Sequence, residues 1–423
     1  MIRLVYFSRS AFSVFGLPED YLPTGETLVI SFWIVIFTTI GYFRMKSRRR
    51  MVRDLRHAQT KLKYLEEKLI SEKRNEGKKG VRIFMDGAFD MMHYGHMNAF
   101  RLGRSLGTHL IVGVNSDKSI MECKGPPLMK YEERLKMVKA CKFVDQVVPD
   151  CPYVMNKEYL DYVIEKYDID YVIHGDDPCI VNGKDVYETA KIAGKYRSIP
   201  RTEGVSTTDI VGRMLLMTKE HHYKESEILG HTSRFLTTSH MLRLFGAGIK
   251  APLPNMKVVY LDGAFDMFHC GHVSLLEEAR KYGDYLIVGV HSDAAVNREQ
   301  GQNLPLMNLH ERVLSVMGCR LVDDVLIDAP YEITPDMVNR LKISIVVEFS
   351  DATNPSMPAK KDRFQFPRKA GILKIVNNPS NFKFTNIIQR ISENQSTFQA
   401  KFDRKSKAER EYQISKYGLP VAQ

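Results

Sequence analysis

The chain has 423 residues, more than one ordinary domain needs, and this length predicts two domains that each bury a core. Its hydrophobic fraction of 44% and charged fraction of 26% are typical of globular proteins and exclude a chain that is disordered throughout. The six cysteines include no C-x-x-C pair, so we expect reduced thiols, and neither a disulfide framework nor a zinc site is indicated.

The net charge of +11 is concentrated near the start of the chain. Residues 44–80 contain 14 Lys and Arg against 5 Asp and Glu, so the rest of the chain is close to neutral. This basic segment directly follows 27–43, a run of 17 residues without a charge. A basic block beside an apolar run is typical of a membrane surface and not of a nucleic-acid site.

The apolar run predicts a transmembrane helix over 27–43, after an N-terminal segment 1–26. Seventeen helical residues span about 26 Å, close to the roughly 27 Å core of a thin bilayer. The basic residues that follow predict that the rest of the chain is cytosolic. A buried core helix is the alternative, and a cleaved signal peptide would have the opposite charge order. The endoplasmic reticulum and the outer mitochondrial membrane both remain open, because the first 16 residues hold Arg3, Arg9 and no acidic residue.

The basic segment 44–80 also carries apolar residues at alternating spacings of four and three. This pattern predicts a helical stalk that could form a homodimer through a short coiled coil. A single amphipathic helix lying on the membrane explains it equally well. The residues concerned are Met51, Leu55, Ala58, Leu62, Leu65 and Leu69.

The remaining sequence contains one pattern twice. The run DGAFDMMHYGH at 86–96 returns as DGAFDMFHCGH at 262–272, and LIVGV at 110–114 returns at 286–290. We therefore predict two copies of one domain, 81–217 and 256–395, joined by a linker over 218–255 and followed by a charged tail over 396–423. Short apolar strands alternate with helices in each copy. This alternation predicts a Rossmann-like α/β fold with a doubly wound parallel sheet and a ligand crevice at the carboxyl ends of its strands.

Two histidines mark that crevice in the first copy. His93 and His96 are three residues apart at the start of a predicted helix, and so share one face. The free N–H groups and positive end of a helix N-terminus suit phosphate. Gly87 and Gly95 let the backbone approach closely. Two imidazoles can donate hydrogen bonds to a triphosphate and to charge that grows in the transition state. A helix cap or a metal site is the alternative.

A second phosphate clamp is predicted at 201–208, with the sequence RTEGVSTT. Gly204 permits a tight turn, and Ser206 and Thr207 can cap the helix that follows. The guanidinium of Arg201 can bind phosphate oxygens through two donors. Taken alone, the segment is only a capped helix start.

The pairing of HYGH with RTEGVSTT resembles the cytidylyltransferase family, within the HxGH nucleotidyltransferases. The duplication, the GDD at 175–177 and the KGPP at 124–127 are similar to the ethanolamine-phosphate cytidylyltransferase family, and the N-terminal segment resembles its plant-type members. The resemblance implies that the phosphate of phosphoethanolamine attacks CTP directly. CDP-ethanolamine and pyrophosphate would form, on the route to phosphatidylethanolamine. We expect Mg²⁺ to accompany CTP without a dedicated protein site.

The resemblance also implies roles for individual residues. The triphosphate would be held by His93, His96, Lys124 and Arg201. The nucleotide would be bound by Gly87, Ala88, Phe89, Gly95, Asp117, Asp145, His174, Asp176, Asp177, Thr202, Gly204, Val205, Ser206, Thr207 and Thr208. For the amine we infer Asp86 and Tyr153, because an ammonium group favours carboxylate and aromatic neighbours, with ordinary structural roles as the alternative.

The second copy keeps His269 and His272 but loses other charges of the predicted site. Gln300 replaces Lys124, and NPSNFKFT at 378–385 replaces RTEGVSTT. Losing two charge-assisted bonds should weaken phosphate binding by several kcal/mol. We therefore expect this copy to support the first as an internal pseudo-dimer, with a weak nucleotide site left open.

The sequence leaves other functions open. Phosphocholine or glycerol phosphate could replace phosphoethanolamine, since the chemistry is the same. ATP in place of CTP is disfavoured, because RTEGVSTT resembles the CTP-using branch of the family. From another class, the chain could be a noncatalytic nucleotide-binding scaffold tethered to a membrane. A transfer-RNA synthetase is not indicated, because no K-M-S-K-S motif follows.

Overall fold

The computed structural model describes residues 33–39, 41, 80–176, 179–181, 183–202, 205–215, 235–301, 304–350, 362–400, 402–404, 407 and 411. The chain divides into two compact units, Met1–Lys79 and Gly80–Gln423. The predicted N-terminal segment, the stalk before Gly80, and the first part of the predicted linker lie outside the described residues.

The predicted transmembrane helix over 27–43 is wrong. Of this segment the structure describes 33–39 and residue 41, all of them as helix. No helix within the described ranges is both long enough and apolar enough to cross a membrane.

The first domain is built on a parallel five-stranded sheet with the order β3-β2-β1-β4-β7. Its strands contain short runs of buried apolar residues, as expected for a sheet covered on both faces. β1 pairs along its whole length with β2. The strands are β1 (Arg82–Gly87), β2 (His109–Asn115), β3 (Gln146–Cys151), β4 (Tyr171–Gly175) and β7 (Tyr196–Ile199), with a small hairpin of β5 (Ile180–Val181) and β6 (Lys184–Asp185).

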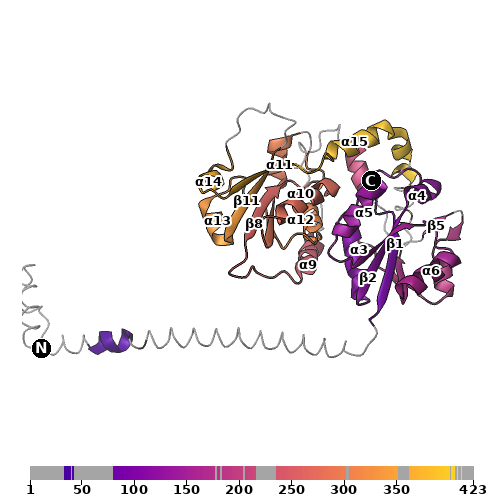
Figure 1. The fold of residues 1–423 in the computed structure, drawn as a ribbon, viewed down its shortest axis with the longest axis horizontal. Helices are drawn as coiled ribbons and strands as arrows, with labels where there is room; N and C mark the ends of the chain where they lie inside the picture. Colours follow the sequence, from indigo (N-terminus) through magenta and orange to yellow (C-terminus); the bar gives the residue numbers. More distant parts are fainter. Residues whose placement is uncertain are drawn as a thin grey trace, which may run out of the picture. The chain divides into compact units, whose positions relative to one another are not determined.

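Helices cover both faces of this sheet because successive strand residues point to opposite sides. Ile83 and Met85 of β1 belong to the same buried cluster as residues of α3 and α5, whereas Phe84 packs in the cluster of α6 and α7 (Figure 1). The helices are α3 (Tyr94–Ser105), α4 (Asp117–Lys124), α5 (Tyr131–Ala140), α6 (Lys157–Tyr167), α7 (Glu188–Ile192) and α8 (Thr207–Leu215).

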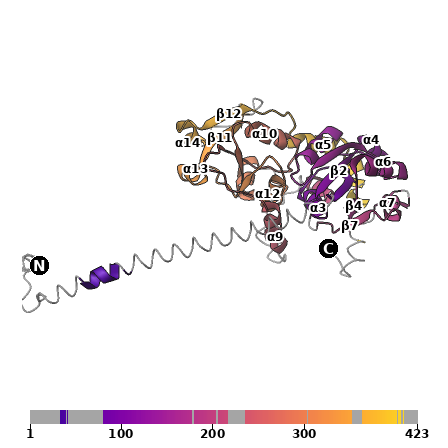
Figure 2. The same ribbon diagram turned by 60° about the horizontal axis from the view of Figure 1, so that its bottom comes forward.

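The second domain repeats this design, with the sheet order β10-β9-β8-β11-β12. α10 and α12 cover one face, and α13 and α14 the other (Figure 2). The arrangement agrees with the predicted pair of parallel α/β domains. Its strands are β8 (Val258–Gly263), β9 (Tyr285–Val290), β10 (Asp324–Ile327), β11 (Ile343–Ser350) and β12 (Leu373–Asn377), and its helices are α9 (Phe235–Gly246), α10 (Cys270–Arg280), α11 (Asp293–Gln300), α12 (Leu309–Met317), α13 (Pro335–Leu341), α14 (Gln365–Lys369) and α15 (Phe384–Glu393).

The two domains contact each other through equivalent residues in both directions. Arg213 of the first domain forms two bonds of 2.7 and 2.9 Å with Glu311 of the second. Arg390 of the second forms two bonds of 2.7 and 2.8 Å with Glu133 of the first. One cluster of buried apolar residues also runs through both domains. The contact therefore resembles the self-complementary interface of a two-fold dimer.

Replacing Glu311 by Gln should lower the free energy of unfolding by about 1–2 kcal/mol. The amide keeps the helix-cap bond to Asn308 but loses the charge that faces Arg213, whose side chain is 34% exposed. Chemical denaturation measures the change. Glu277→Gln is the control, because the Glu277 side chain is 50% exposed in its pair with Lys136. An equal loss of unfolding free energy in both variants would contradict a stabilising role for the pair of Arg213 and Glu311.

Candidate active site

The HYGH turn connects the carboxyl end of β1 to α3. Phe89 and Met91 adopt left-handed backbone angles, each with φ of 50°, which turn the chain back toward the sheet. His93 is the N-cap of α3, and its Nδ1 accepts the N–H of Gly95 at 3.1 Å. The N–H of His93 donates in turn to Nδ1 of His96 at 3.3 Å. The two rings are therefore fixed side by side, with centroids 4.1 Å apart.

These cap bonds decide where each imidazole carries its proton. Nδ1 of both His93 and His96 accepts a backbone N–H, so the neutral rings are protonated at Nε2. The cap therefore leaves each ring with an N–H donor on its opposite side. His93 is buried and His96 is half-buried. Capping and hydrogen-bond donation to a ligand are compatible functions of the same side chains.

The RTEGVSTT turn packs directly on this helix end. The hydroxyl of Thr202 donates to the carbonyl of Gly95 at 3.3 Å and accepts from the side chain of Asn98 at 2.9 Å. A Cβ on Gly95 would lie 2.8 Å from Val205, so only glycine allows this approach. The hydroxyl of Thr207 reaches the Asp90 carbonyl at 3.2 Å. The two motifs, about a hundred residues apart, thus form one surface.

The remaining residues predicted in this turn and in the loop after β4 are partly described by the structure. The N–H of Arg201 donates to Asp176 at 3.1 Å, which ties the turn to the loop after β4. The side chain of Arg201 is exposed and that of Ser206 is buried. Asp177, Gly204 and the side chain of Thr208 lie outside the described residues.

A second group of side chains surrounds Asp86, at the carboxyl end of β1. The Tyr187 hydroxyl donates to Asp86 at 3.1 Å, and the His174 ring lies 4.6 Å from the Tyr187 ring. Burial raises the pKa of Asp86 to about 6, against the opposing effect of hydrogen bonds from Tyr187 and Asn115. A carboxylate beside aromatic rings is suited to an organic cation.

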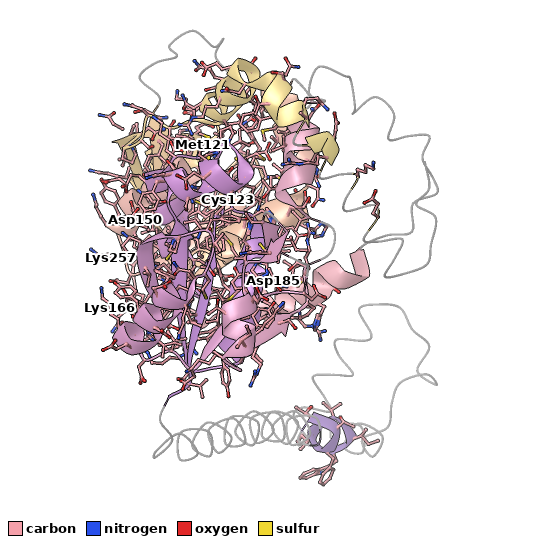
Figure 3. All side chains as sticks on the ribbon, turned by 90° about the vertical axis from the view of Figure 1, so that its right-hand side faces the viewer. Met121, Cys123, Asp150, Lys166, Asp185 and Lys257 are labelled. Carbon is pink, nitrogen blue, oxygen red and sulfur yellow. The ribbon has the colours of Figure 1, made fainter. Side chains whose placement is uncertain are left out.

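Tyr153 and Lys124 belong to the same edge of the sheet. Lys124 Nζ lies 5.5 Å from the centroid of the Tyr153 ring, and Tyr153 packs with the cluster that contains Tyr187. Figure 3 shows Cys123, the neighbour of Lys124 on α4, toward the upper part of the domain and Lys166, near the end of α6, toward the lower part. α6 ends just before β4 begins, so α4 lies by the carboxyl ends of the strands.

Two predicted nucleotide residues have structural partners instead. The carboxylate of Asp117 pairs with the fully buried Arg134 at 2.6 Å, and Arg134 also donates to the Ala88 carbonyl at 2.5 Å. Asp145 accepts the N–H of Leu110, at the start of β2, and pairs with Arg104 at 2.7 Å. The prediction that Asp145 frames the nucleotide is therefore not supported, because the amino ends of parallel strands lie opposite the crevice.

Sequence reasoning missed three residues that organise this edge. Asp90 accepts the N–H groups of Leu128 and Met129, both at 2.8 Å, and so fixes the loop after α4. Its repetition as Asp266, and that of Arg134 as Arg312, was the available signal. Tyr187 offered none, because it belongs to no local motif. The missed residues are Asp90, Arg134 and Tyr187.

Comparisons with known proteins show the family of the chain. A family model described as "Cytidylyltransferase-like" matches residues 84–213 and 260–365. An ethanolamine-phosphate cytidylyltransferase of Arabidopsis thaliana is 43% identical over 361 residues, which cover 79% of this chain and 86% of the relative. The chain belongs to the ethanolamine-phosphate cytidylyltransferase family. Enzymes of this name from Dictyostelium discoideum and Mus musculus are 44% and 41% identical, over 78% of this chain and over 96% and 90% of their own lengths.

The second copy of this member of the ethanolamine-phosphate cytidylyltransferase family has altered surroundings at its histidines. His269 and His272 repeat the cap, with bonds of 3.2 Å each. Phe382 stands where the first copy has Val205, and its ring meets His269 edge-on at 5.1 Å. Burial lowers the pKa of His269 to about 4. This histidine therefore carries no positive charge near neutral pH.

Proposed function

We propose that the first domain transfers the cytidylyl group of CTP to phosphoethanolamine, giving CDP-ethanolamine and pyrophosphate. The names of the relatives support the substrates. The main structural support for the site is the contact of the 201–208 turn with the start of α3, through Thr202 and Gly95. This contact brings together two groups of phosphate-binding residues that are distant in the sequence.

The reaction is an in-line displacement at phosphorus. An oxygen of the phosphoethanolamine phosphate attacks the α-phosphorus of CTP, the bond to the oxygen that bridges the α- and β-phosphorus breaks, and pyrophosphate leaves with that electron pair. The Nε2–H groups of His93 and His96 donate to the oxygens that gain charge. Arg201 and Lys124 neutralise the phosphates, so the domain acts mainly by positioning and charge compensation.

CTP enters as its Mg²⁺ complex in this proposal. In the described part of the chain no group of three or more His, Cys, Asp or Glu side chains could hold a metal ion. Mg²⁺ prefers phosphate oxygens and water to an all-protein cage, so the triphosphate itself can carry the ion.

Asp86, Tyr153 and Tyr187 bind the ammonium group. The buried carboxylate supplies an opposite charge, and the rings supply polarised faces. The geometry of the cluster around Asp86, with the Tyr187 bond of 3.1 Å, supports this role. The second domain completes an internal pseudo-dimer that stabilises the first, and carries no transfer itself.

Turnover with a panel of acceptors tests the proposal. The full chain is incubated with Mg²⁺, CTP and, separately, phosphoethanolamine, phosphocholine or glycerol 3-phosphate, and pyrophosphate release is followed. Phosphoethanolamine should react fastest, and ATP should not replace CTP. Absence of pyrophosphate with every acceptor would leave only a nucleotide-binding scaffold, and a preference for another acceptor would refute the substrate.

A further inference from the structure

The second copy keeps the parts of the cluster that we assign to the ammonium group. Asp262 stands at the position of Asp86 in the repeated motif. Tyr153 follows a proline after β3, and Tyr331 follows a proline after β10, the equivalent strand of the second sheet. A carboxylate and an aromatic ring are thus present at the carboxyl edge of both sheets.

Both copies have a second aromatic ring at equivalent positions, although the residue type differs. Phe364 caps α14 as Tyr187 caps α7. The N–H of Tyr187 donates to Asp185 at 2.9 Å, and the N–H of Phe364 donates to Asp362 at 3.1 Å. These matching bonds align Phe364 with Tyr187. The residue before Phe364 is Arg363, whereas the residue before Tyr187 is the uncharged Val186.

The guanidinium group of Arg363 lies in this cluster of the second copy. Its Nη2 donates to Asp262, and its Nη1 lies 3.0 Å from Nε2 of His291. Its central carbon lies 4.9 Å from the Tyr331 centroid and 4.6 Å from that of Phe364. One carboxylate and two ring faces around a cation are the surroundings that an organic ammonium ion favours.

Burial makes this pairing important for the second domain. The side chain of Asp262 is 2% exposed and that of Arg363 is 16% exposed. A buried carboxylate without a cation is strongly unfavourable, so removing Arg363 leaves a cost that another cation could relieve. Nδ1 of His291 lies 3.1 Å from the Ala329 carbonyl and therefore donates to it, which leaves Nε2 to accept from Arg363.

We propose that Arg363 is an internal substitute for the substrate's ammonium group, which fills the amine pocket of the second copy and closes it to phosphoethanolamine. This inference rests on the proposed function only for the role of the equivalent pocket in the first copy. The crevice beside Arg363 remains open, with a cavity of about 520 Å³ that Asp262, His269 and Arg363 help to line. A small external cation can therefore reach Asp262 once the guanidinium is removed.

Chemical rescue of Arg363→Ala in the full chain tests the proposal. All variants carry Asp86→Asn, which removes the carboxylate of the first pocket. Arg363→Ala should lower the melting temperature by roughly 5–10 °C relative to Asp86→Asn alone. Addition of 50 mM ethylammonium chloride should restore several degrees more than 50 mM NaCl does. Ethylammonium chloride should not change the melting temperature of the protein that retains Arg363, because the guanidinium group fills its pocket.

Two matched variants control for general salt effects. Arg340→Ala removes an arginine whose side chain is 77% exposed in a surface pair with Asp336, and ethylammonium should restore nothing there. In Arg363→Ala combined with Asp262→Asn the carboxylate is neutral, so the response should disappear. A response of Arg363→Ala no larger than that of Arg340→Ala would overturn the proposal.

A second pair of variants applies if Arg363→Ala does not fold. Arg363→Lys keeps a cation and Arg363→Met keeps only the length, so the Lys variant should melt several degrees above the Met variant. Equal melting temperatures would show that a cation is not what the pocket requires. These melting experiments do not depend on turnover, so this inference and the proposed function can fail separately.

Discussion

His93→Ala is expected to lower kcat for pyrophosphate release by about 100- to 1,000-fold, the usual effect of losing one donor to a developing oxyanion. The KM for phosphoethanolamine should change little, because His93 faces the nucleotide phosphates in our proposal. Alanine also removes the cap bond to Gly95, which has a length of 3.1 Å. Steady-state kinetics with the full chain measure both constants.

His93→Asn separates the two functions of this histidine. Asparagine is a good N-cap, so it should keep the start of α3 intact, yet it has no group equivalent to Nε2–H. We expect its kcat to fall as far as that of His93→Ala, with a smaller loss of stability. His269→Ala breaks the equivalent cap in the second copy, at 3.2 Å, and should leave kcat near that of the unaltered chain. Loss of turnover in His269→Ala alone would contradict the assignment of the active copy.

Asp86→Asn is expected to raise the KM for phosphoethanolamine by about 30-fold or more, since removing one partner of a buried charge pair costs about 2–5 kcal/mol. The amide keeps the size of the side chain and can still accept the Tyr187 hydroxyl. The KM for CTP should stay within a few-fold of its value in the unaltered chain. An unchanged KM for phosphoethanolamine would place the ammonium group elsewhere.

The same residue predicts a pH dependence. Burial raises the pKa of Asp86 to about 6, so the carboxylate is charged above this pH and becomes neutral below it. The kcat/KM for phosphoethanolamine should therefore fall as the pH drops below about 6. The phosphate of the substrate also titrates near pH 6, by analogy with other phosphate monoesters. Asp86→Asn shows the effect of the substrate alone, and identical profiles in both proteins would contradict a role for Asp86 ionisation.

Much of the fold could be predicted from the sequence, because repetition and buried strands leave local signals. β1, β2 and β4 are short apolar runs, and the helices near them begin at polar caps. β3 leaves a weaker signal because it is an edge strand that contains Pro149 and Asp150, which a central strand would exclude. The hydropathy of 27–43 gave a wrong transmembrane helix, because no helix in the described part of the chain is both long and apolar enough to cross a membrane.

The candidate site was predictable only where its residues form local motifs. His93, His96 and the 201–208 turn are recognisable within a few residues of sequence, and the fold brings them together. Tyr187 is 101 residues from Asp86, and their contact depends on how the chain returns after β4. Asp145 has a structural role that no local motif reveals and that the second copy repeats: Asp323 accepts the N–H of Leu286 at 2.7 Å, as Asp145 accepts that of Leu110.

Hydrogen–deuterium exchange of the full chain with and without Mg²⁺ and CTP shows whether the two motifs of the first copy bind the same nucleotide. We expect slower amide exchange in peptides that cover 93–98 and 201–208, because both segments would hold one chain of phosphates. Peptides that cover 269–274 and 378–385 should exchange at unchanged rates. Protection of 269–274 and 378–385 without protection of 93–98 and 201–208 would contradict the assignment of the nucleotide site to the first copy.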